Sequence, residues 1–131
     1  MNTKLNKILA EISAGELIDK ITILEIKKIK IKDNDKLIEV EKELVSLNET
    51  MDKFITEPSK IENFKKNLKE VNLKLWDIEN GKRFAEKKGD FDEKFIELAR
   101  NVYKSNDLRA KIKLEINNIL GSNIKEVKSH E

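Results

Sequence analysis

The chain has 131 residues, of which 40% are charged, yet its net charge is only +2 because basic and acidic residues nearly balance. This length suits one domain with one core, and the balance disfavours a nucleic-acid binder, which gathers basic residues on one face. The absence of cysteine excludes disulfides and thiolate chemistry. One proline and four glycines favour long helices. We expect one helical domain over residues 1–121 and a tail over 122–131.

The N-terminal residues 1–12 are mostly polar, and their apolar run is too short for a signal peptide or a membrane span. We therefore expect a cytoplasmic protein that has no membrane contact.

The segment from Ser13 to Ile31 predicts the central helix of the domain, over about 14–32. Ser13 and Glu16 match a capping box, in which the hydroxyl accepts a backbone N–H and the carboxylate returns to the cap. The apolar residues that follow cover most of the helix circumference, so this helix needs neighbours on several sides. Alternating isoleucines also allow a strand, but the capping box and the length favour a helix. These apolar residues are Leu17, Ile18, Ile21, Ile23, Leu24, Ile26, Ile29 and Ile31.

Two further helices are expected, and they carry matching apolar seams. One spans about 35–55, and the next follows a second capping box at Ser59 and Glu62 and ends at Gly89. Pro58 separates them, because proline disfavours a helical residue before it. Matched seams joined by a short loop predict that these two helices pack on each other as an antiparallel coiled-coil hairpin. The seams are Leu37, Val40, Leu44, Leu47, Met51 and Phe54, and then Ile61, Phe64, Leu68, Val71, Leu75 and Ile78.

A fourth helix is expected over about 91–120, after a third cap pair at Asp90 and Glu93 and before the stop signal Gly121. The predicted fold class is therefore all-α, an antiparallel bundle of four principal helices. The tail is expected to be extended, with Ile124 and Val127 as its only apolar anchors. The only histidine, His130, lies in this tail and is not expected to bind a metal ion.

Polar residues interrupt the apolar faces of the first and fourth helices. Glu25 and Lys28 interrupt the first helix, and Ser105 and Arg109 interrupt the fourth. Arginine occurs only three times in the chain, and its planar fork suits carboxylates or phosphates better than lysine does. Two helices interrupted near their middles predict one shared polar layer inside the bundle, with Glu25 facing Arg109.

Two interpretations of this layer remain open. A buried Glu25–Arg109 pair, with Ser105 or its neighbour completing the hydrogen bonds, would be structural and would determine helix register. Alternatively, Arg109, Arg100 and Lys28 would hold a small anion such as a sugar phosphate or a nucleotide.

Four other residues and a tryptophan have simpler expected places. Asp19 and Lys20 are expected on the exposed face of the first helix as solvated charges. Asn106 and Asp107 are expected to cap a kink in the fourth helix rather than to turn polar groups inward. Trp76 lies off the seam and is expected to pack on the first helix rather than to mark an exposed interaction patch.

Several stretches of the chain resemble one family. They are residues 13–27 (SAGELIDKITILEIK), 71–79, 91–103, 106–110 (NDLRA) and the pair at 121–122. They are similar to an uncharacterised family of short bacterial and phage-borne helical proteins, a domain of unknown function, often encoded among genes for cell-surface polysaccharides and glycosyltransferases. The resemblance hints at a pathway and implies no reaction. It marks Glu16, Asp19, Lys20, Thr22, Glu25, Arg100, Asn106, Asp107 and Arg109 as motif positions.

The favoured function is a non-enzymatic helical interaction or scaffold module. It would self-associate, most simply as a two-fold dimer, or dock the helices of a protein partner. No nucleophile, redox or metal-binding motif is present, so no cofactor and no metal are expected. The alternative is a protein that binds, or an all-helical enzyme that acts on, a small anionic ligand. A nucleic-acid partner is disfavoured by the balanced charge and by the scattered aromatic residues.

Overall fold

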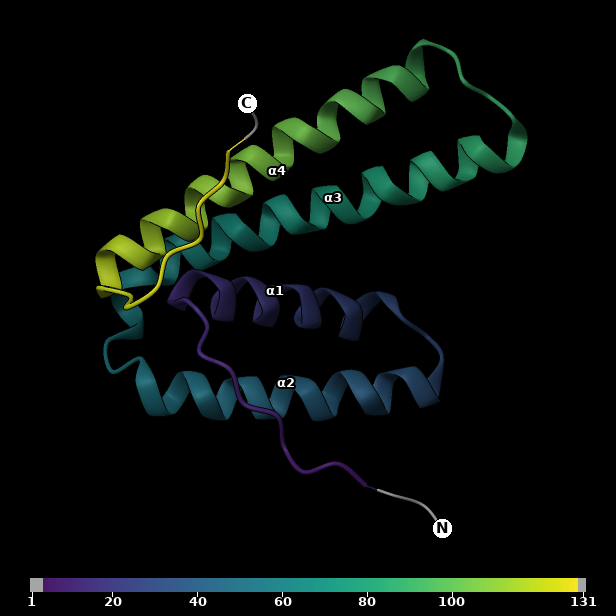
Figure 1. Ribbon diagram of the computed structural model, residues 1–131. Helices are drawn as coiled ribbons and strands as arrows, with labels where there is room; N and C mark the ends of the chain where they lie inside the picture. Colours follow the sequence, from purple (N-terminus) through teal and green to yellow (C-terminus); the bar gives the residue numbers. More distant parts are fainter. Residues whose placement is uncertain (1–3, 130–131) are drawn as a thin grey trace.

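The computed structural model describes residues 4–129, and within them all regular structure is helical (Figure 1). Helix α1 spans Ala14–Lys30, α2 spans Asn34–Phe54, α3 spans Glu62–Lys88 and α4 spans Glu93–Leu120, with a short 3-10 turn, η1, at Pro58–Ile61. The all-α class and the four principal helices expected from the sequence are confirmed. The helix ends lie within a few residues of the expected ones.

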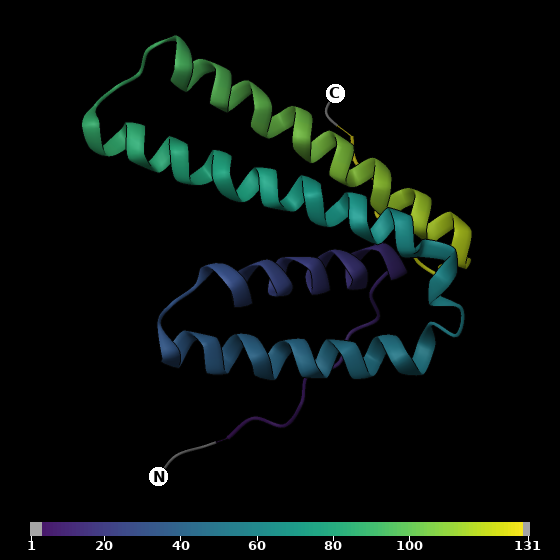
Figure 2. The same ribbon diagram turned by 180° about the vertical axis from the view of Figure 1, so that it is seen from behind.

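Helix α1 is central, as its apolar circumference predicts, and it packs against each of the other three helices. Figures 1 and 2 show an α1–α2 hairpin beside an α3–α4 hairpin, with α1 on the side of its hairpin that faces α3 and α4. Four of its apolar side chains, Leu17, Ile18, Ile21 and Leu24, are at most 5% exposed. Burial of each such side chain contributes about 1.5–3 kcal/mol, so α1 supplies much of the core.

The expected coiled-coil hairpin of α2 and α3 is wrong, because these two helices do not pack against each other. The seam of α2 lies on α1 instead, where Val40 and Leu44 are buried, and its last member, Phe54, is 70% exposed. Helix α3 packs on α4 and on α1. A seam shows which face of a helix is apolar, but several apolar surfaces can cover that face. Helix α1 is apolar on several sides, so it covers the seam of α2 and also packs on α3 and α4, between the two hairpins.

The first predicted helix start is confirmed in part, and two predicted stops are confirmed. The Ser13 hydroxyl accepts the Glu16 backbone N–H at 3.1 Å, but the Glu16 carboxylate pairs with Lys113. Gly89 and Gly121 end α3 and α4 with φ values of 70° and 65°, in the left-handed region that glycine adopts without a Cβ penalty.

The other two predicted capping boxes are wrong. Pro58 begins the turn η1, which includes Ser59, so α3 starts at Glu62 without a side-chain cap. Helix α4 is capped by Asp92 rather than by Asp90, and the Asp92 carboxylate accepts the backbone N–H groups of Lys94 and Phe95. At α4 a neighbouring aspartate with the same chemistry marks the boundary, whereas at α3 a turn that begins with proline leads into the helix.

The α3–α4 hairpin continues past the α1–α2 hairpin as a two-helix projection (Figures 1 and 2), here named the arm and comprising residues 79–104. No residue of the arm is buried, although α3 up to Ile78 and α4 from Ser105 onward both contain buried residues. The arm lacks a third helix to cover it, and this explains its exposure.

After Gly121 the chain is extended and runs back along α4 (Figure 1). Polar contacts hold it there, since Glu126 pairs with Lys113 and Lys128 pairs with Asp107, each at 2.8 Å. The expected apolar anchors contribute less, because Ile124 is 39% exposed and Val127 is 88% exposed. His130 lies outside the described residues. In the described part of the chain, no helix is long and apolar enough to cross a membrane.

Candidate functional site

A buried ion pair joins α1 to α4 at the centre of the bundle. Arg109 donates from Nε to Asp19 Oδ1 at 2.8 Å and from Nη2 to Oδ2 at 2.5 Å, so both carboxylate oxygens are engaged. Asp19 is 0% exposed, and the Arg109 side chain is 29% exposed. The hydrogen bond with Asp19 raises the pKa of Arg109, against the opposing effect of its burial. This bidentate geometry is the strong form of an arginine–carboxylate pair.

Two uncharged groups complete the surroundings of Asp19. Asn72 of α3 donates from Nδ2 to Asp19 Oδ1 at 2.9 Å and to Thr22 Oγ1 at 3.0 Å. Thr22 in turn donates its hydroxyl to the Asp19 backbone carbonyl at 2.7 Å. Three helices therefore meet at one carboxylate, and in the described residues no buried side-chain nitrogen or oxygen lacks a partner. A fully satisfied network of this kind specifies one arrangement of the helices.

A second ion pair lies one turn further along α4 and connects it with α1 and the tail. Lys113 Nζ contacts Glu16 Oε2 at 2.7 Å and Glu126 Oε2 at 2.8 Å, and its side chain is only 10% exposed. Burial alone would lower the pKa of Lys113, but its hydrogen bonds with Glu126 and Glu16 outweigh this and the pKa is raised. The charged form of this lysine is therefore favoured inside the fold.

The start of α1 touches the backbone of α4. The Gly15 N–H donates to Asn117 Oδ1 at 2.6 Å, and the Ala14 N–H donates to the Ser122 hydroxyl at 3.0 Å. A Cβ at Gly15 would overlap the backbone carbonyl of Lys113, so only glycine allows this approach. Side chains from α4 and the tail thus cap α1 and occupy the place where a helix N-terminus would otherwise bind an anion.

The predicted polar layer exists, but the predicted Glu25–Arg109 pair is wrong. Glu25 faces α3, with its carboxylate 3.5 Å from Lys69 and 3.9 Å from Lys65. Asp19 replaces Glu25 as the partner of Arg109, and the expectation that Asp19 is solvated is also wrong. Residues 19 and 25 are six positions apart, which changes the facing direction by about 120° in an α-helix and explains the different partner.

The three basic residues proposed to hold an anion do not gather. Lys28 pairs with Glu41 of α2 at 3.0 Å, and Arg100 is exposed on the arm. Arg109 alone lies in the layer, where Asp19 engages it. The anion site in the form drawn from the sequence is therefore not assembled.

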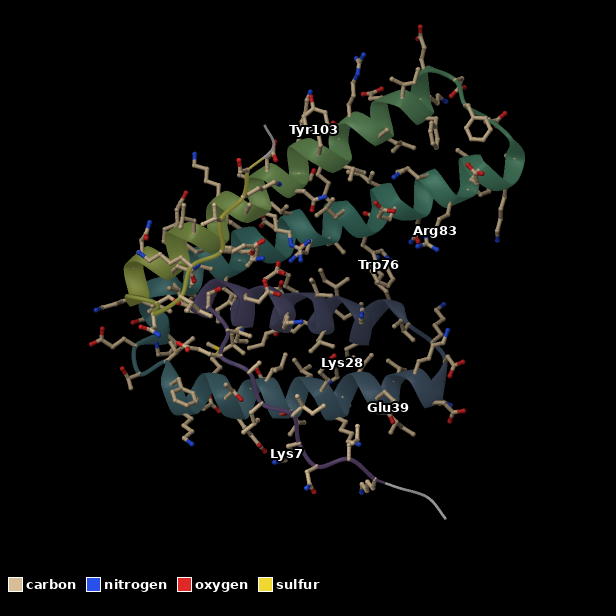
Figure 3. All side chains as sticks on the ribbon, viewed as in Figure 1. Lys7, Lys28, Glu39, Trp76, Arg83 and Tyr103 are labelled. Carbon is tan, nitrogen blue, oxygen red and sulfur yellow. The ribbon has the colours of Figure 1, made fainter. Side chains whose placement is uncertain are left out.

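The remaining predicted residues lie around the layer. Lys20 is exposed, as expected, and Ser105 is buried beside the layer at 6% exposure. Asn106 is half-buried and Asp107 is exposed, but α4 runs through both without a break, so they do not cap a kink. Trp76 is half-buried and projects from α3 towards α1, as expected (Figure 3).

Sequence reasoning missed Asn72, Lys113, Asn117 and Glu126. A signal for two of them was present, because Ser105, Arg109, Lys113 and Asn117 repeat every fourth residue and form one polar stripe on α4. Asn72 and Glu126 come from α3 and the tail, and no local pattern marks either of them.

A surface hollow of about 400 Å³ opens beside the layer, between α1, α3 and α4. Helix α3 supplies most of its wall, and Arg109 reaches it from α4. Its lining includes Ile23, Ile26, Trp76, Asn80, Arg83 and Arg109. Figure 3 shows Trp76 and Arg83 projecting from the same side of α3, towards α1. Of the three arginines of the chain, two therefore line one hollow.

The fold and the layer define a small all-α protein in which a central helix is anchored by buried ion pairs. The chain belongs to the family of unknown function DUF6165, whose model matches residues 8–131. The comparison with curated proteins and the comparison with solved structures each find no match.

Proposed function

We propose that this protein is an interaction module that pairs with a second copy of itself through the arm. The observation that carries the proposal is the apolar content of the arm, which has no buried residue although it holds seven large apolar side chains. They are Phe84, Phe91, Phe95, Ile96, Leu98, Val102 and Tyr103.

The aromatic residues of the chain are unevenly distributed, and this supports the proposal. Three of the five phenylalanines and the only tyrosine lie in the arm. Phe84 is 60% exposed, Phe91 56% and Tyr103 57%. Exposed aromatic side chains are enriched at protein interfaces, and a two-helix hairpin alone buries little apolar surface. Two arms that pack together would form a four-helix bundle with a core of its own.

The charges of the arm favour a second copy as the partner. From Glu79 to Lys88, α3 carries four basic and two acidic side chains. From Asp90 to Arg100, the loop and α4 carry four acidic and two basic side chains. The acidic excess lies in the connection between the helices, at Asp90 and Asp92, because α4 within the arm carries two acidic and three basic side chains. A two-fold axis that pairs the tips of two arms would place this acidic connection beside the basic end of α3 of the other copy, in both directions.

Sedimentation equilibrium over micromolar to millimolar concentrations tests the proposal. The wild type is expected to approach twice the monomer mass, and Phe84→Glu to remain monomeric. Ile38→Glu is the matched control, since Ile38 is 64% exposed on α2, outside the arm. A monomeric wild type at every concentration would contradict the proposal. An equal effect of the control variant would contradict the location of the interface.

The setting of this module is a further part of the proposal. The resemblance described for residues 13–27 and 106–110 supports a cytoplasmic role in bacteria or their phages, in the assembly of surface polysaccharides. Capture of another protein by the arm, with the wild type monomeric, would favour a heterologous partner over a second copy.

A further inference from the structure

The hollow beside the polar layer combines a flat aromatic surface with two guanidinium groups. Its α1 wall is apolar, formed by Ile23 and Ile26, and Trp76 of α3 lies in the same hollow. Trp76 is half-buried and lines the hollow, and an indole face that is open to a hollow is a surface on which another planar ring can stack. Stacking on an aromatic face is tolerant of the ring's identity.

Arg109 is held in place for binding by its pair with Asp19. That pair uses Nε and Nη2, and the bidentate geometry leaves Nη1 on the far edge of the planar guanidinium group. Arg109 also lines the hollow. A donor whose side chain is already ordered loses little conformational entropy when a ligand binds.

Arg83 adds a second cation to the same hollow. Among residues 4–129, no ion pair within 4 Å involves Arg83. The one carboxylate of the lining, Glu79, is paired with Lys82 at 3.8 Å. Since Asp19 compensates Arg109 and Lys82 compensates Glu79, Arg83 supplies the positive charge of the hollow beside Trp76. The volume of about 400 Å³ lies at the small end of ligand sites.

We propose that this hollow binds a small planar ring that carries a phosphate or a carboxylate. The ring stacks on Trp76, and the anionic group lies between Arg83 and the free edge of Arg109. This site differs from the one drawn from the sequence, because Arg83 takes the place of Arg100 and Lys28. The arm supplies Glu79, Asn80 and Arg83 to this hollow, but the proposed binding does not rest on self-association.

Trp76 is the only tryptophan of the chain, so its fluorescence reports on the hollow directly. The full-length protein is titrated with adenosine monophosphate and with benzoate, which distinguish a phosphate from a carboxylate as the anionic group. Adenosine and inorganic phosphate serve as the ring alone and the anion alone. We expect a saturable change in tryptophan emission with at least one of the two complete probes. The ring alone and the anion alone should each bind at least about tenfold more weakly, because each lacks interactions worth at least one charge-assisted hydrogen bond.

Arg83→Ala is expected to weaken binding of the complete probe about tenfold or more. Arg100→Ala is the matched control, because it removes another exposed arginine of the arm that lies outside the hollow. Both variants remove one positive charge from the arm. Absence of a saturable change with both complete probes, equal binding of adenosine and its monophosphate, or equal weakening by the two variants would overturn the proposal.

Discussion

Helices α3 and α4 take part in two regions of very different character. In the base, which comprises α1, α2 and residues 62–78 and 105–120, these helices pack on α1 and contain fully buried side chains such as Leu68 and Ile116. In the arm, the same two helices have only each other, and none of their residues is buried. The comparison teaches that a continuous apolar seam produces a core only where a third helix covers it.

The two regions also use charge differently. In the base, Asp19, Arg109 and Lys113 are enclosed and paired with defined geometry. In the arm, the charged side chains are exposed, and their ion pair between Glu79 and Lys82 is long, at 3.8 Å. Removing one member of a buried pair costs several kcal/mol of stability, whereas an exposed pair contributes little. Mutations of charged residues should therefore lower the stability far more in the base than in the arm.

The largest effect is expected for Asp19→Leu, which leaves the guanidinium group of Arg109 without its partner. Loss of one member of a buried pair costs about 3–5 kcal/mol, and the partial exposure of Arg109 places the expected loss near the lower limit, about 3 kcal/mol. Urea unfolding followed by circular dichroism measures it. The double variant Asp19→Leu with Arg109→Leu should recover part of the loss, and a single variant as stable as the wild type would contradict a structural role for the pair.

A glycine-to-alanine substitution should have opposite effects in the two regions. Gly15→Ala places a methyl group against the Lys113 backbone and should destabilise the base by about 2 kcal/mol, as overpacking does. Gly81→Ala in the arm meets only the flexible Leu98 side chain, at 3.3 Å, and should stabilise α3 by about 0.5–1 kcal/mol. Thermal unfolding of the two variants compares them, and a Gly15→Ala variant as stable as the wild type would show that the close approach at Gly15 is not required.

A smaller effect is expected for Lys113→Met, and it should depend on pH. Since the folded-state pKa of Lys113 is raised, its stabilising contribution is fully present below the ordinary lysine pKa of about 10.4 and is lost as the pH rises through the higher folded value. The wild type should therefore exceed the variant in stability at neutral pH, and the difference should shrink above about pH 10. Parallel urea titrations measure this, and a difference independent of pH would contradict the ion-pair origin.

The smallest effect is expected for Glu25→Leu, at about 0.5 kcal/mol or less, because the pairs of Glu25 with Lys65 and Lys69 are long and partly exposed. A double-mutant cycle of Glu25 and Arg109 should show almost no coupling, while the cycle of Asp19 and Arg109 should show strong coupling. Equal coupling in both cycles would mean that the layer extends to Glu25.

The sequence indicated the presence of a polar layer but misidentified its partners. Arg109 stands at a position where an apolar residue is expected, and this irregularity was visible without a structure. Its partner depends on how α1 is rotated about its axis, and an apolar circumference as wide as that of α1 leaves this rotation undetermined. The pattern placed Glu25 on the interrupted apolar face and Asp19 on the exposed face, and only the packing of three helices selected Asp19.

Local sequence alone determined the helical class, the central place of α1 and the stops at Gly89 and Gly121. These properties arise from period, composition and backbone conformation within a few residues. The tertiary structure alone decided that α2 packs on α1, that the tail reaches Lys113 and that Trp76, Arg83 and Arg109 share a hollow. Each of these contacts joins residues far apart in the chain. Whether it forms depends on which apolar helix faces pack against each other, and several of these faces are similar. That choice is made by the packing of the whole domain, so no local pattern records it.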